Sequence, residues 1–115
     1  MSHIDAEYLQ ELYKADHGLI EKMKHAFLLH GAESLNSLLD FSKSKNFEKL
    51  DFDLHKFKSQ CQSAGVLTLE PIFSEIILLS KKESEENIML ISNKLKDVQK
   101  ISESVFKELK NNLKG

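Results

Sequence analysis

The residue that stands out for its chemistry is His55, which lies in the segment DLHKFKSQCQSAGV (residues 53–66). Apolar residues recur there in steps of three and four, which predicts a helix with one buried stripe. The stripe comprises Phe47, Leu50, Leu54, Phe57, Cys61 and Ala64. Each helical residue advances by about 100°, so His55 lies about 100° away from the stripe. We expect an exposed imidazole, whose nitrogen is a competent nucleophile near neutral pH.

Four polar side chains share this outward face with His55. They are Asp51 four residues before it, and Lys58, Ser59 and Gln62 at three, four and seven residues after it. A phosphoryl group is a strong anion, and the Lys58 ammonium can offset its charge through hydrogen bonds. Ser59 and Gln62 can donate hydrogen bonds without crowding a docking protein. This environment suits a phosphoryl carrier, but the spacing alone is more typical of a plain solvated helix face.

The same segment resembles the signature of the histidine phosphotransfer (HPt) family, a histidine followed by x-Leu-Lys-Gly-Ser and an apolar-Gly-Ala ending. His55, Phe57, Lys58 and Gly65 match in register, and Val66 stands where a small apolar residue is usual. The likeness extends over roughly residues 17–80. Further matching positions are Phe27, Leu35, Leu38, Leu69, Ile72 and Ile76.

Three positions differ from the usual HPt pattern. Ser59 stands where the family most often has glycine, Ile77 stands near a usual acid, and Asn46 stands where Asp often precedes the histidine helix. A serine at position 59 adds one hydroxymethyl group beside the histidine, which is sterically tolerable but brings the side chain closer to a partner's backbone.

The resemblance implies a phosphorelay intermediate that accepts a phosphoryl group on His55 and passes it to a response regulator. The partners would be receiver domains and a hybrid sensor kinase, and the receiver would supply Mg²⁺. The chain itself would need no cofactor and have no kinase or ATP-binding activity, in keeping with its lack of a Gly-rich phosphate loop. The competing interpretation is a helical adaptor, or a transfer-inactive HPt-like module, that only binds signalling partners.

A docking patch is expected near His55 on the preceding helix, because residues 19–29 carry more apolar side chains than one buried face needs. Whichever of Leu19, Met23 and Leu28 faces outward would form it. The alternative is that the N-terminal segment, residues 4–13, covers these side chains.

Composition predicts an all-α protein with one domain over residues 1–115. The chain has one proline and four glycines, with 41% apolar and 30% charged residues. The periodicity predicts a short N-terminal capping helix over residues 4–13 and four main helices over residues 17–44, 47–64, 69–80 and 84–113. Gly31 could bend or divide the first of these four. Short turns between them favour an antiparallel up-down four-helix bundle.

Charge and motif content exclude several other classes. The net charge is −2, and all 16 basic residues are lysines interleaved with acids, which argues against nucleic acid binding. No segment has the length of a membrane span or the pattern of a secretory signal, so we expect a cytoplasmic monomer. His17, His25 and His30 are not spaced as metal ligands, and no Glu-x-x-His pair faces the core, so no metal site is predicted.

Overall fold

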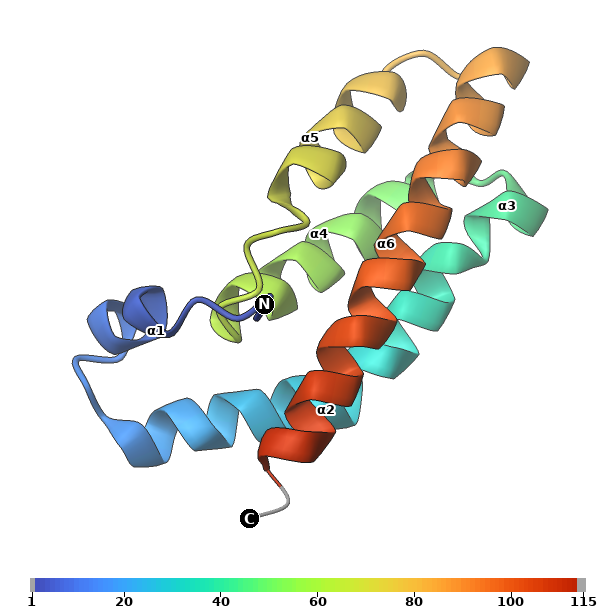
Figure 1. Cartoon of the computed structure of the whole chain (residues 1–115). Coiled ribbons are helices and arrows are strands. Elements are labelled where there is room, and N and C mark those ends of the chain that lie inside the picture. Colours follow the sequence, from blue (N-terminus) through green and yellow to red (C-terminus); the bar gives the residue numbers. More distant parts are fainter. Residues whose placement is uncertain (1, 114–115) are drawn as a thin grey trace.

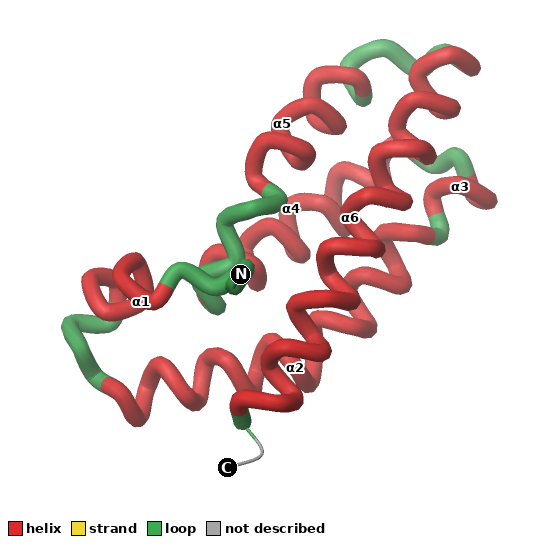
Figure 2. The backbone as a smooth tube through the Cα atoms, in the orientation of Figure 1, coloured by secondary structure: helices red, strands yellow, loops and turns green. Residues whose placement is uncertain are grey.

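The structure is a computed structural model that describes residues 2–113, and in that part of the chain it is all-helical, as expected (Figure 1 and Figure 2). The helices are α1 (Ala6–Leu12), α2 (His17–Leu39), α3 (Phe41–Ser44), α4 (Phe47–Ser63), α5 (Glu70–Leu79) and α6 (Glu85–Asn112). Within the described range, no helix combines the length and the apolar character needed to cross a membrane.

Three helix starts were predictable from their capping residues. The side chains of Asp16, Asn46 and Ser84 each accept a hydrogen bond from the backbone N–H three residues later, at 3.0, 3.0 and 3.1 Å. These bonds satisfy N–H groups that have no partner inside the helix. Pro71 lies in the first turn of α5, where its missing N–H costs no hydrogen bond. The expected boundaries of α4, α5 and α6 are therefore confirmed to within a residue or two.

The expected helix over residues 17–44 is wrong at its end. The helix runs through Gly31 without a break, but it stops at Leu39, and Phe41–Ser44 form the separate short helix α3. Phe41 is buried and packs edge-on against Phe47, with ring centroids 5.1 Å apart, so α3 folds back toward the start of α4. Gly31 lets the Phe106 ring of α6 approach closely, since a Cβ there would lie 3.0 Å from that ring, which is tighter than ordinary van der Waals contact.

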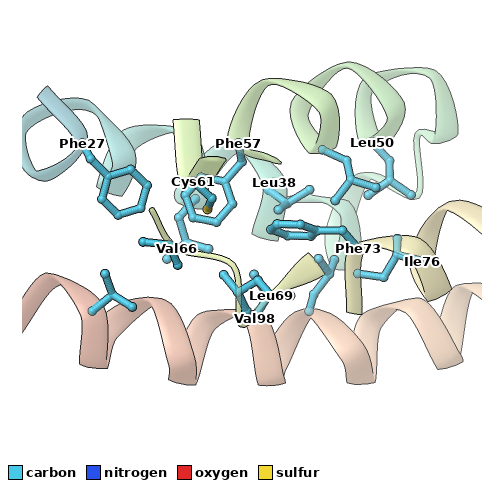
Figure 3. Close-up of a cluster of buried hydrophobic side chains, with 14 of the residues drawn as sticks. Phe27, Leu38, Leu50, Phe57, Cys61, Val66, Leu69, Phe73, Ile76 and Val98 are labelled. Atoms are coloured by element: carbon cyan, nitrogen blue, oxygen red, sulfur yellow. The ribbon is translucent and has the colours of Figure 1, made fainter. Parts of the chain in front are cut away.

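The core lies between α2, α4, α5 and α6. Helix α2 packs against α4 and α6, and α5 packs against α6 and α4. Phe57 of α4 is fully buried at the centre, with its ring centroid 6.0 Å from those of Phe27 and Phe73 (Figure 3). The predicted apolar stripe of α4 is buried from Leu50 to Ala64, while Phe47 is half-buried. Burial of that stripe fixes which face of α4 remains at the surface.

The N-terminal segment packs over the end of α4. Leu9 of α1 is buried, the Tyr13 hydroxyl donates to the Ser63 carbonyl oxygen at 2.7 Å, and the Asp5 N–H donates to the Gly65 carbonyl oxygen at 2.8 Å. Gly65 ends α4 with φ = +75°, a conformation that side chains disfavour.

Lys49 links the start of α4 to the end of α2. Its ammonium donates to the Asp53 carboxylate at 2.7 Å and to the Ser37 carbonyl oxygen at 3.0 Å. Asp53 is buried, so its carboxylate depends on this partner. The Ser37 carbonyl lies in the last turn of α2, where a cation is favoured by the helix dipole. This cluster holds the helix that carries His55 against α2.

Gly65→Ala should destabilise the protein by about 2–4 kcal/mol, because it adds strain at positive φ to overpacking. The new Cβ would lie 2.7 Å from Leu9 Cγ. Urea unfolding followed by circular dichroism measures the effect. The control is Gly18→Ala, whose Cβ would meet only Asp16 Oδ1 at 3.6 Å, and which should leave stability unchanged or raise it by up to about 1 kcal/mol. Equal effects of the two substitutions would contradict this description of the turn.

Lys49→Met should destabilise by about 1–3 kcal/mol, since it leaves the buried Asp53 carboxylate without its cation. Lys24→Met is the matched control. Lys24 lies 3.8 Å from the exposed Glu21 carboxylate, and such surface pairs contribute little. The two substitutions are compared by chemical denaturation at pH 7, and a loss for Lys24→Met as large as that for Lys49→Met would contradict the role given to Asp53.

Candidate functional site

His55 lies on the surface of α4, with 60% of its side chain exposed. Its Nδ1 atom is 2.8 Å from the backbone carbonyl oxygen of Asp51, one turn earlier on the helix. A carbonyl oxygen can only accept a hydrogen bond, so Nδ1 carries the proton. In the neutral ring the lone pair then belongs to Nε2, on the far side of the imidazole. The expectation of an exposed, nucleophilic imidazole at this position is consistent with this geometry.

The Asp51 carboxylate adds a second oxygen near the same nitrogen. One of its oxygens lies 3.4 Å from Nδ1, and both side chains are mostly exposed. Solvent therefore screens the charge interaction, which is weak for a neutral ring. It becomes favourable when the ring acquires positive charge, so Asp51 can stabilise such a state without restricting access to Nε2.

On one side of His55, Lys58 and Gln62 turn toward α5. The Gln62 amide donates to Glu70 Oε1 at 2.8 Å, and the Lys58 ammonium lies 4.0 Å from Glu70 Oε2. Lys58 is half-buried, with 29% of its side chain exposed. Both residues lie on the predicted face of α4 beside His55. Their polar groups are directed toward the Glu70 carboxylate.

On the other side of His55, Ser59 is exposed and borders a shallow depression between α4 and α2. Its lining includes Met23, Ala26 and His30 from α2, and Ser59 and Ser63 from α4. The Ser59 hydroxyl is thus accessible, as expected for a residue beside a docking protein. The depression brings together a small apolar surface and two hydroxyl groups, of which that of Ser59 lies about one turn from the histidine.

The three residues of the expected docking patch are not on one surface. Leu19 is 38% exposed, and Met23, one turn later on α2, lines the depression beside Ser59. Leu28 packs against the core and lines a separate depression with Lys110 and other residues near the end of α6. Of the three, only Met23 lines the depression that Ser59 borders. The N-terminal segment contacts both α2 and the end of α4.

Two residues near His55 were missed by the sequence analysis. Phe52, one turn before His55, is 68% exposed and lines an open depression with His55 and Lys56. It was detectable as the one aromatic residue of α4 outside the apolar stripe. Glu70 gave no such signal, because its contact with Lys58 and Gln62 depends on how α5 packs against α4.

Other chemistry-bearing residues do not form a site. Burial raises the pKa of the Cys61 thiol far above its ordinary value, and the negative charge of Glu70 raises it further. The thiol therefore stays protonated and is not a nucleophile. Across residues 2–113, no group of three or more His, Cys, Asp or Glu side chains is arranged to hold a metal ion.

No family model, curated protein or solved structure significantly matches this chain. The described part of the chain is all-helical, and its α4 helix carries an exposed histidine whose ring is oriented by a hydrogen bond. Any functional assignment has to follow from that histidine and its neighbours.

The hydrogen bond to Asp51 predicts that neutral His55 is mainly the Nδ1–H tautomer. Long-range proton–nitrogen NMR correlations at pH above 8 measure this directly. His17 and His25 serve as controls, because their rings have no hydrogen bond within the described part of the chain and should favour the Nε2–H form of free imidazole. A dominant Nε2–H form at His55 would contradict the geometry.

Proposed function

We propose that this protein is a phosphorelay intermediate that accepts a phosphoryl group on His55 Nε2 from a receiver-domain aspartate, or from a kinase, and passes it to a response regulator. The observation that carries the proposal is the Nδ1 hydrogen bond to the Asp51 carbonyl, which leaves the Nε2 lone pair free on an exposed ring. The resemblance of residues 55–66 to the HPt signature supports the same assignment.

In the proposed reaction this chain provides the nucleophilic nitrogen and nearby charges, and the partner provides the aspartyl phosphate. The Nε2 lone pair attacks the phosphorus of a partner's aspartyl phosphate, a P–N bond forms, and the P–O bond breaks with its electrons returning to the aspartate. The ring becomes positively charged while Nδ1 keeps its proton. The Asp51 carboxylate, 3.4 Å from Nδ1, favours that charge, and the Lys58 ammonium can neutralise the phosphoryl oxygens.

The proposal extends to the fold and the partners. Helices α2, α4, α5 and α6 would form an antiparallel up-down four-helix bundle of the HPt type, capped by α1. The protein would act as a cytoplasmic monomer with receiver domains and a hybrid sensor kinase as partners. Mg²⁺ would be bound by the receiver, and the chain itself would provide the nucleophile and no catalytic metal.

Incubation of the protein with a phosphorylated receiver domain should transfer label to His55. The label should be acid-labile and alkali-stable, as phosphohistidine is, and should fall to background in His55→Gln because the attacking nitrogen is gone. Labelling is followed by gel autoradiography after alkali treatment.

His30→Gln is the matched control, because His30 is also exposed and borders the depression beside Ser59. It should keep its label. Label retained in His55→Gln would contradict the proposal. Stable binding of the receiver with no label on the wild-type chain would favour an adaptor that only binds signalling partners.

A further inference from the structure

A single carboxylate on α5 engages two polar residues of the histidine-bearing helix. Glu70 Oε1 accepts a hydrogen bond from the Gln62 amide at 2.8 Å, and its Oε2 lies 4.0 Å from the Lys58 ammonium. Glu70 is the first residue of α5, where the helix dipole favours a negative charge. Its side chain is 31% exposed, so the charge is partly protected from solvent.

The two interactions differ in strength. The hydrogen bond from Gln62 has ordinary length and fixes the carboxylate against α4. The contact with Lys58 is at the long limit for an ion pair, and such partly exposed pairs are weak. Gln62 therefore holds the Glu70 carboxylate in place, while the Lys58 ammonium can leave Glu70 for another anion.

Phosphorylation of His55 would place a second anion within reach of Lys58. His55 and Lys58 are three residues apart on α4 and lie on the same face. A phosphoryl group on Nε2 carries more negative charge than one carboxylate and offers three acceptor oxygens. The Lys58 ammonium then has two competing partners, the Glu70 carboxylate on α5 and the phosphoryl group on α4.

We infer that Glu70 is a positioning residue that sets the lifetime of phosphohistidine at His55 by competing with the phosphoryl group for Lys58. This rests on the proposed function only in taking His55 as the phosphorylated residue. Without Glu70, Lys58 stays with the phosphoryl oxygens. Its positive charge then favours loss of the Nδ1 proton, so that less of the phosphohistidine is in the cationic ring form that hydrolyses. In that hydrolysis, water attacks phosphorus and the P–N bond breaks with its electrons returning to Nε2. The ring becomes neutral, and orthophosphate leaves with the two protons of the water.

The test uses the full chain phosphorylated with phosphoramidate, which transfers its phosphoryl group to imidazole with release of ammonia and needs no protein partner. Decay of phospho-His55 is followed by ³¹P NMR, with site assignment by mass spectrometry. Glu70→Gln should lengthen the half-life roughly 2- to 5-fold, in line with the loss of a weak competing pair. The amide oxygen of the new side chain can still accept the bond from Gln62.

Two comparisons isolate the effect of Glu70. In a Lys58→Ala background, Glu70→Gln should leave the half-life unchanged, because the group for which it competes is absent. Glu75→Gln is the matched control, since Glu75 lies on the same helix but pairs with Lys94. It should leave the half-life unchanged in the wild-type background.

Several results would overturn the inference. One is a half-life that Glu70→Gln leaves unchanged or shortens. Another is a lengthening of the same size when Glu70→Gln is made in the Lys58→Ala background, or when Glu75→Gln is made in the wild-type chain. The last is failure of phosphoramidate to modify His55. Because no receiver domain takes part, this test can succeed even if transfer from a receiver fails, and it can fail while transfer succeeds.

Discussion

The hydrogen bond between His55 Nδ1 and the Asp51 carbonyl oxygen is the interaction on which the functional account depends. It uses a backbone acceptor one turn earlier on the same helix, so it requires no contact from another element. It fixes the orientation of the ring and places the neutral lone pair on Nε2. An exposed histidine without this bond would sample both tautomers and several rotamers.

The packing of α4 determines how its outer face is divided. Burial of the stripe around Phe57 turns His55 outward, and the neighbouring helices then approach on either side of it. On the α5 side lie Lys58 and Glu70, which provide charge. On the α2 side lie Ser59 and a shallow, partly apolar depression. The nucleophile thus sits between a charged region, suited to an anion, and a contact region, suited to a protein.

Much of this could be predicted from the sequence, because the signals are local. The cap at Asn46, the apolar stripe of α4 and the stop at Gly65 each depend on a few consecutive residues, and together they place His55 at the surface. The break at Asp40 and the role of Glu70 could not be predicted, because they follow from packing between helices. The position of Leu28 against the core depends in the same way on where α6 ends.

The most direct test of the account identifies the nitrogen that carries the phosphoryl group. After transfer from a phosphorylated receiver domain, the ³¹P chemical shift of the protein distinguishes phosphorylation at Nε2 from phosphorylation at Nδ1. The account predicts a single phosphohistidine resonance with the shift of the Nε2 isomer. A resonance of the Nδ1 isomer would show that the Asp51 hydrogen bond does not direct the chemistry, and the absence of any phosphohistidine signal would contradict the carrier function.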